Sequence, residues 1–170
     1  MIPRYLLALE MTDGMFLKCF MKVAEDFPDI ESNDYMVDAA CYTMAKSPEK
    51  LDVLCAPNQY GDIMSYLAAG LVGSMGLAPG ANIGEAAAVF EASHGAAPYI
   101  AGKGIANPAA LILSGALMLR HIGKVKEGKA VEDATYEVMG KDGVRTPELG
   151  GTATTAKFSE AVAKKVQSML

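Results

Sequence analysis

Four features that often reveal a protein's class are missing from this sequence. It has no block of Lys and Arg, and its net charge of −5 argues against binding to nucleic acid. No apolar run is long and uninterrupted enough for a membrane span, and the first residues lack a signal-peptide cleavage pattern. The cysteines are odd in number and lack metal-type spacing, so we expect reduced, buried thiols in a cytoplasmic protein: Cys19, Cys41 and Cys55.

What the sequence does contain is enough apolar material for one domain or slightly more. Its 170 residues are 51% hydrophobic. Apolar runs typical of strands are interspersed with runs of helical spacing, which predicts an α/β fold with a short sheet flanked by helices. We expect strands near 35–37, 51–56 and 86–90, helices near 15–26, 39–45, 60–75, 108–121, 131–139 and 156–167, and a polar connector at 124–130. We expect Thr155 to cap the last of these helices, and its inward face to carry Phe158, Ala161, Val162 and Val166.

The stretch from Pro57 to Pro108 carries the strongest local signal. An apolar strand pattern, Ala86 to Phe90, leads into the glycine- and alanine-rich loop HGAAPYIAGKG. Asn107 and Pro108 follow, and Asn then Pro is a common helix start. Backbone N–H groups in such a loop, beside a helix N-terminus, can approach an anion closely. The residues alone therefore predict a nucleotide or anion loop and nothing more specific.

Several rare strings, in a fixed order, resemble the isocitrate and isopropylmalate dehydrogenases, and in particular the NAD-dependent isocitrate dehydrogenases. They are TDGMFLKCF, PNQYGDIMS, AAGLVGSMGLAPGANIG, VFEASHGAAP, IAGKGIANP, LSGALMLRHIG and TPELGGTATT. The resemblance implies a partial fold of that family, because the chain has about half the family's length and matches its C-terminal half. Residues 1–75 would form a small-domain-like segment with dimer helices. Residues 76–170 would form the C-terminal part of the large cofactor-binding domain, unless the two parts merge into one body.

The same resemblance implies NAD and Mg²⁺ or Mn²⁺ as the family's cofactors, together with the residues that would hold them. Asp62 matches the metal ligand supplied within a subunit, and Asp38 matches the ligand supplied by the opposite subunit. Either aspartate can also be read as a helix cap, since Asp is common there. Five loop positions match residues that contact the adenosine part of the cofactor: His94, Gly95, Ala97, Ile100 and Asn107.

Other positions depart from the family pattern in one direction. Tyr5 falls on the proton-handling lysine and Leu7 on a nearby asparagine. Tyr66 falls on a second metal-binding aspartate, one helical turn after Asp62. In the cofactor loop, Ala96 replaces a threonine, and Tyr99 replaces the aspartate that binds the ribose hydroxyls. Polar groups expected in one cleft have thus become aromatic or apolar.

These departures predict a chain that has lost catalysis, with no confident catalytic residue and no cofactor expected to bind well. We expect an inactive fragment or an engineered scaffold, whose cleft has become a protein-binding or self-association surface that includes Tyr5, Leu7, Tyr66 and Tyr99. The alternative structural interpretation is that Tyr5, Leu7 and Tyr66 simply close a core. The alternative function is NAD- and Mg/Mn-dependent oxidative decarboxylation of isocitrate or a related 2-hydroxy acid. A homodimer through helices 15–26 and 60–75, or a protein partner, is expected in either case.

Overall fold

The computed structural model describes residues 3–7, as a backbone strand, and residues 12–170. The chain divides into two compact units, Met1–Leu71 and Val72–Leu170, which we call the N-terminal and C-terminal units. Both combine strands with helices, so the predicted α/β class is confirmed. Within the described residues, no helix combines the length and the apolar content that a membrane span requires.

The N-terminal unit is built on three parallel strands in the order β2-β1-β3. They are β1 (Pro3–Leu7), β2 (Asn33–Met36) and β3 (Val53–Cys55). In the register, Tyr5 lies opposite Asp34 on one side and Cys55 on the other. Parallel strands need crossover connections, which are supplied here by α1 (Thr12–Ala24) and α2 (Val37–Lys46). The helix α3 (Asn58–Val72) follows β3, as the predicted strand–turn–helix unit requires.

Among the described side chains of the N-terminal unit, an apolar cluster and one buried carboxylate link its helices. Ala40 and Met64 are buried, and Cys41 Sγ lies 3.3 Å from Met64 Sδ. The hydroxyl of Tyr60 donates to the buried carboxylate of Asp13 at 3.0 Å, which links the first turns of α1 and α3. Burial and then this hydrogen bond raise the pKa of Tyr60.

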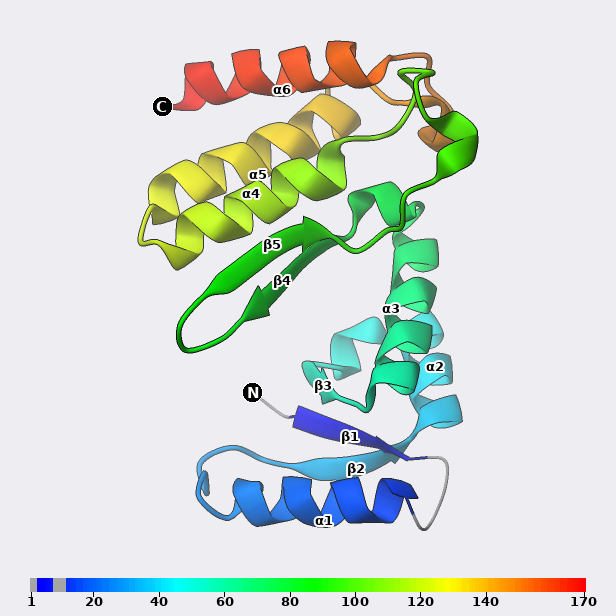
Figure 1. The fold of residues 1–170 in the computed structure, drawn as a ribbon, viewed down its shortest axis with the longest axis vertical. Helices are drawn as coiled ribbons and strands as arrows, with labels where there is room; N and C mark the ends of the chain where they lie inside the picture. The colour runs from blue at the N-terminus through cyan, green and yellow to red at the C-terminus, as the bar shows by residue number, and fades with distance from the viewer. Residues whose placement is uncertain (1–2, 8–11) are drawn as a thin grey trace. The chain divides into compact units, whose positions relative to one another are not determined.

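The C-terminal unit is a hairpin and three helices arranged as layers (Figure 1). The hairpin pairs β4 (Pro79–Ile83) with β5 (Ala88–Ala92), and α4 (Ala109–His121) packs on it. The helices α5 (Val125–Gly140) and α6 (Thr155–Met169) complete the stack. The hydroxyl of Ser114, on α4, donates to Glu91 O at 2.7 Å and accepts from Gly80 N at 3.3 Å, so one buried side chain fastens both strands to α4.

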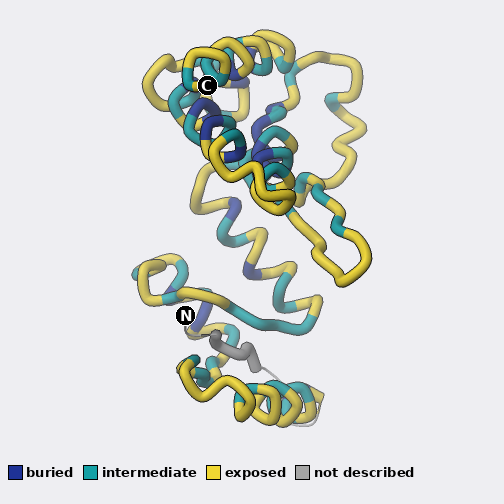
Figure 2. Tube along the Cα trace, turned by 90° about the vertical axis from the view of Figure 1, so that its left-hand side faces the viewer, coloured by how far each residue is buried: buried dark blue, intermediate teal, exposed yellow. Residues whose placement is uncertain are grey.

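The core of the C-terminal unit lies among these helices, where Figure 2 shows buried segments. Phe158 and Val162 of α6 meet Ala134 and Val138 of α5 and Ala109 of α4. The sequence predicted that Phe158 and Val162 point inward, and this is confirmed. Two helices of the pattern, 108–121 and 156–167, are also found close to their predicted bounds.

Four local expectations were wrong. Residues 124–130 are not a connector, because α5 begins at Val125. The strand expected at 86–90 spans 88–92, and its partner β4 was not predicted at all. The terminal helix is capped by Thr154, whose side chain accepts from Lys157 N at 3.2 Å, and not by Thr155. The cysteines are free but not buried: Cys19 is exposed, and Cys41 and Cys55 are partly exposed.

Candidate functional site

The C-terminal unit contains a cavity of about 1010 Å³. Three segments line it: the turn after α3, the loop between β5 and α4, and the segment that leads into α6. All five residues predicted to contact a cofactor lie on its wall, namely His94, Gly95, Ala97, Ile100 and Asn107. The structure therefore gathers them in one place, and their role as cofactor contacts stays a prediction.

The loop between β5 and α4 owes its shape to unusual backbone angles. Ala97 has a φ of +44°, the only positive φ at a non-glycine position among the described residues. This left-handed conformation is uncommon for alanine, and such strain tends to occur at binding sites. A short turn of 3₁₀ helix, η3 (Pro98–Ile100), follows directly. The chain then passes through Gly102 and Gly104, both with positive φ, before it reaches α4.

Asn107 ends the loop, and the two polar atoms of its side-chain amide differ in their hydrogen bonding. Its Oδ1 accepts a hydrogen bond from Ala109 N at 2.9 Å and so caps α4. Its Nδ2 is buried and has no partner in the described structure, and the residue as a whole is only 8% exposed. Gly76 packs against this side chain, since a Cβ on Gly76 would lie 2.9 Å from Asn107 Cβ. The cap fixes the amide with its donor end unsatisfied, in the wall of a cavity.

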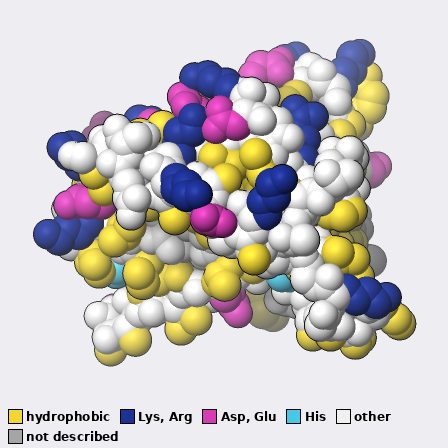
Figure 3. Space-filling model, turned by 90° about the horizontal axis from the view of Figure 1, so that it is seen from above, with side chains coloured by type: hydrophobic (Ala, Val, Ile, Leu, Met, Phe, Trp, Pro, Cys, Tyr) yellow, Lys and Arg dark blue, Asp and Glu magenta, His cyan; other side chains and the backbone are white. Residues whose placement is uncertain are grey.

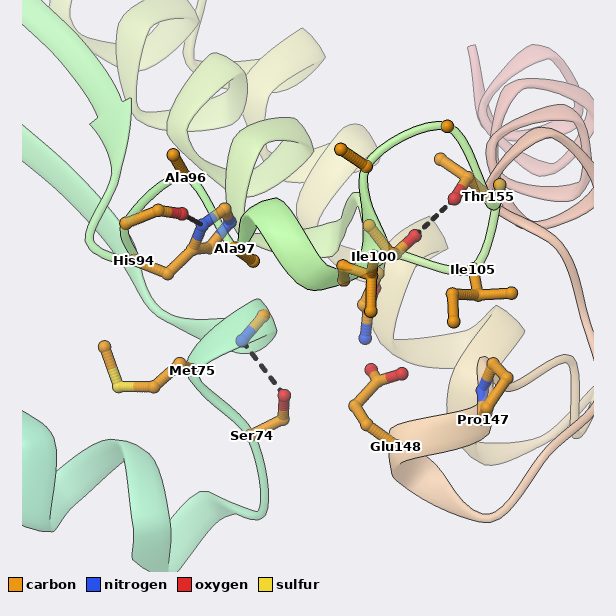
Figure 4. Close-up of a pocket in the computed structure, with 17 residues that line it drawn as sticks. Ser74, Met75, His94, Ala96, Ala97, Ile100, Ile105, Pro147, Glu148 and Thr155 are labelled. Atoms are coloured by element: carbon orange, nitrogen blue, oxygen red, sulfur yellow. Dashed lines mark hydrogen bonds between the residues drawn. The ribbon is translucent and has the colours of Figure 1, made fainter.

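Hydrogen bonds at the rim join two of the three lining segments and shape the third. Thr155 Oγ1 donates to Ala106 O at 2.6 Å, and Thr155 N donates to Gly104 O at 2.8 Å, which ties the start of α6 to the loop. Ser74 Oγ accepts from Gly76 N at 3.0 Å and shapes the turn after α3. In Figure 4, Ile100 and Ile105 present apolar side chains to the cavity, with Ser74 and Glu148 below them.

Several lining residues were not predicted from the sequence. The string TPELGGTATT was used only as a mark of resemblance, yet Pro147, Glu148 and Thr155 all come from it and line the cavity. Ser74 and Gly76 also line the cavity, and they belong to another family string, AAGLVGSMGLAPGANIG. Membership of these strings is the one feature of the sequence that could have indicated the additional lining residues. Local patterns do not reveal that residues 74–76 and 147–155 lie beside residues 94–107.

The candidate metal ligands belong to the N-terminal unit. Asp38 lies in the first turn of α2, where its Oδ1 accepts from Ala39 N at 2.7 Å, which supports the capping interpretation. Asp62 lies in the second turn of α3, not at its start, and its Oδ2 accepts from Asn58 Nδ2 at 3.3 Å. Both are exposed. The described residues contain no group of three His, Cys, Asp or Glu side chains that could hold a metal ion, so they do not fit Mg²⁺ or Mn²⁺ by themselves.

The residues predicted to form a new interface are divided between the two units, and their role stays a prediction. Tyr66 lies on α3 in the N-terminal unit and is 59% exposed, so it does not fill a core. Tyr99 lies in η3 of the C-terminal unit and is 86% exposed. The backbones of Tyr5 and Leu7 are in β1, but their side chains lie outside the described structure.

Comparison with known proteins gives consistent matches along the chain. The family model described as isocitrate/isopropylmalate dehydrogenase matches residues 8–162. A 3-isopropylmalate dehydrogenase of Archaeoglobus fulgidus is 51% identical over 155 residues, which is 91% of this chain and 47% of that protein. An isocitrate/homoisocitrate dehydrogenase of Thermus thermophilus is 50% identical over 161 residues, covering 95% of this chain and 48% of that protein.

The structural comparison agrees with the sequence comparison. The crystal structure of isocitrate dehydrogenase from Methylococcus capsulatus matches with a TM-score of 0.91 and 44% identity. The match covers 98% of this chain and 50% of that one. This chain thus spans about half the length of the curated relatives that it matches.

Proposed function

Since the chain belongs to the isocitrate/isopropylmalate dehydrogenase family, we propose that its C-terminal unit binds the adenosine half of an NAD-type dinucleotide, and that this chain alone does not turn over a 2-hydroxy acid. The observation that carries the binding proposal is the buried Nδ2 of Asn107, without a partner in the cavity wall. An unpaired buried donor costs free energy, which an acceptor atom on a ligand would recover. A ring nitrogen of adenine is such an acceptor.

The rest of the cavity suits the same ligand. Ile100 and Ile105 offer apolar surface to the face of a base. The loop at His94 to Ala97 is rich in small residues, so a sugar or phosphate can lie close to its backbone. When bound, NAD would supply the hydride acceptor, and the residues of this chain would bind and orient its adenosine end.

The catalytic half of the proposal rests on the N-terminal unit. By resemblance to the family, a divalent cation would need carboxylates at both Asp62 and the position of Tyr66, and a lysine at the position of Tyr5 would handle the proton. A phenol on an exposed helix face is a poor substitute for a carboxylate ligand. Loss of a proton-transfer group alone costs about 10²–10⁴ in rate. We therefore expect no measurable turnover by this chain.

A second candidate is the full reaction of the family, NAD- and Mg/Mn-dependent oxidative decarboxylation of isocitrate or a related 2-hydroxy acid. The exposure of Asp38 and Asp62 favours it, since a second polypeptide could bring further oxygen ligands to either side chain. Turnover that appears only with an added metal and an added partner chain would support this candidate.

A third candidate is the predicted protein-binding or self-association role. It is supported by exposed apolar side chains on α3, namely Ile63, Tyr66 and Leu71.

We do not propose nucleic acid as a partner, because that would require a basic surface. On the face seen in Figure 3, Lys and Arg side chains are mixed with Asp and Glu, and no block of positive charge is seen.

The binding proposal is tested by calorimetric titration of NAD into the wild-type chain and two variants at one position. Asn107→Asp keeps an oxygen that can cap α4 but removes the donor, so we expect near-normal stability and NAD affinity lowered about tenfold or more. Asn107→Ala removes both functions, and its free energy of unfolding should also fall by about 1 kcal/mol. Wild-type affinity in Asn107→Asp would contradict the proposal.

The catalytic part needs a separate assay. NADH absorbance is followed with isocitrate or isopropylmalate and Mn²⁺, and the melting temperature is recorded with each combination of ligands. We expect a shift with NAD alone and no rise in absorbance. Turnover by the isolated chain would mean that other groups perform the roles of the lysine and the aspartate at whose positions Tyr5 and Tyr66 stand. The proposed loss of catalysis would then be wrong.

A further inference from the structure

One side of the helix α4 is apolar and open to solvent. Leu111, Met118 and Ile122 are 60%, 41% and 61% exposed. With Gly115 they recur four, three and four residues apart, which places them along one side of a helix. If Gly115 carried a Cβ, nothing outside its own helix would lie within 4 Å of that atom. We call these four residues the α4 face.

The polar side chains of α4 are engaged elsewhere in the C-terminal unit. Ser114 is buried and bonds to the hairpin. Arg120 donates to Glu132 of α5 at 3.2 Å, and the ring of His121 lies 5.5 Å from that of Phe90 on β5. The other residues of α4 are Ala, Leu, Ile, Met and Gly. A helix that is apolar all round is ordinarily buried, so the α4 face has the composition of a covered surface.

The hairpin on which α4 packs is open as well (Figure 1). The strands β4 and β5 form a sheet of two, and within the described residues neither pairs with a third strand. Ile83 and Val89, near the turn, are 62% and 56% exposed. A two-stranded hairpin is marginally stable by itself, and a free strand edge pairs readily with another strand. Two adjoining elements of one unit therefore lack a cover.

The comparison with solved structures indicates what such a cover would be. The matching crystal structure of isocitrate dehydrogenase superposes on nearly all of this chain but on only half of its own chain. The match is close, so this chain keeps the shape of the corresponding half of a larger body. The two halves of one compact body bury apolar surface against each other. A half that stands alone exposes that surface, as the α4 face and the hairpin do.

We propose that the α4 face and the free edges of the hairpin bind a polypeptide that carries the half of the family fold outside this chain. That polypeptide would place apolar side chains against the α4 face and add a strand to the hairpin. The α4 face carries no charge, so this binding should depend little on salt. The inference is independent of the proposed NAD binding, because no residue of the α4 face lines the cavity.

The test uses the part of the 3-isopropylmalate dehydrogenase relative that lies outside the match, produced in the same cells as the full wild-type chain. We expect the two polypeptides to copurify as a complex with one copy of each. Its dissociation constant, measured by sedimentation velocity, should be about micromolar or lower.

Two substitutions on the α4 face separate docking from folding. Met118→Lys puts a charge into the contact, and Gly115→Lys adds a charged side chain where the free chain has room. Each should weaken the complex about tenfold or more. The melting temperature of the free chain should stay the same in Met118→Lys and should not fall in Gly115→Lys, since glycine disfavours a helix. Tyr136→Lys, at a 52% exposed residue of α5 outside this surface, should bind as the wild-type chain does.

Three results would overturn the inference. The first is the absence of a complex with the wild-type chain. The second is equal binding by the wild-type chain and both α4 variants, or equal weakening by Tyr136→Lys. The third is a second copy of this chain as the occupant of the α4 face, which would appear as self-association that Met118→Lys abolishes without any added polypeptide.

Discussion

Asn107 shows how one side chain can serve folding and binding at once. The sequence identified it as a helix cap, and its Oδ1 does cap α4, although the helix begins at Ala109, one residue later than expected. Capping uses the acceptor end of the amide and so leaves only the donor end for a ligand. The polarity of the ligand atom that Asn107 can bind is thus set by the requirements of the helix.

Glu137 is a residue whose contribution to stability should depend on pH. Its carboxylate accepts from Lys141 at 2.6 Å and lies 3.7 Å from Lys165, which also pairs with Asp142. The hydrogen bond from Lys141 is the main cause that holds the pKa of Glu137 below its ordinary value of 4.5. A carboxyl group with a lowered folded pKa stabilises the fold above its unfolded pKa, and this contribution is lost as pH falls through the folded pKa.

We therefore expect Glu137→Gln to be less stable than the wild-type chain at pH 7, with a difference that narrows as the pH falls below about 4.5. The free energy of unfolding is measured by urea denaturation between pH 3 and pH 7. Glu160→Gln is the matched control, because Glu160 pairs only with Lys164 at an exposed site, and the smaller effect is expected there. A difference for Glu137→Gln that stays constant over this range would contradict the assignment.

At the scale of elements, α5 is the instructive case. Residues 124–130, which include its first turns, contain Gly128 and three lysines, which suggested a polar connector. Gly128 is buried, and a Cβ there would lie 2.8 Å from Ala116 O and 2.7 Å from Arg120 Cγ on α4. The glycine thus lets α5 approach α4 closely. Helix propensity alone disfavours glycine here, and packing between the two helices outweighs it.

This interpretation predicts opposite results for two glycines of the same helix. Gly128→Ala should lower the free energy of unfolding by about 1–3 kcal/mol, since the added methyl group meets the backbone of α4. At Gly140, nothing lies within 4 Å of an added Cβ, so Gly140→Ala should be neutral or stabilising by up to about 1 kcal/mol. Chemical denaturation of both variants is the measurement. Equal effects would mean that close approach is not the reason for Gly128.

At the scale of the whole molecule, each unit has apolar side chains both inside and on its surface. The C-terminal unit has a core shared by three helices. In the described part of the N-terminal unit, Ala40 and Met64 are buried, while the helix α3 exposes Ile63, Tyr66 and Leu71. Apolar side chains repeated along one exposed helix often mark a protein contact. This supports the proposed homodimer through α3.

The corresponding prediction concerns mass in solution. Sedimentation equilibrium should give twice the chain mass of 17.9 kDa for the wild-type chain, and Ile63→Lys should weaken the dimer about tenfold or more. Val125→Lys replaces an exposed apolar residue of the C-terminal unit and should leave the dimer unchanged. A monomeric wild-type chain at micromolar concentrations would contradict the proposal. So would equal weakening by both substitutions.

Local patterns in the sequence determined most of the helices and the identity of the family. The spacing of Phe158 and Val162 determined α6, because a helix with apolar residues three and four apart must bury that face. The family strings added the cofactor loop, and the five residues named from them do line one cavity.

The tertiary structure alone decided features that depend on partners far away in the chain. The strand β4 (Pro79–Ile83) pairs with β5, and a hydrogen bond to Ser114 attaches it to α4. Its own sequence, PGANI, contains no pattern that predicts a strand. Residues 125–130 are helical and Gly128 packs against α4, a contact that the local sequence does not show. Glu148 became a cavity residue because folding places η4 beside the loop at His94. Strand pairing, close helix packing and cavity walls are all contacts between distant residues, so local propensity cannot specify them.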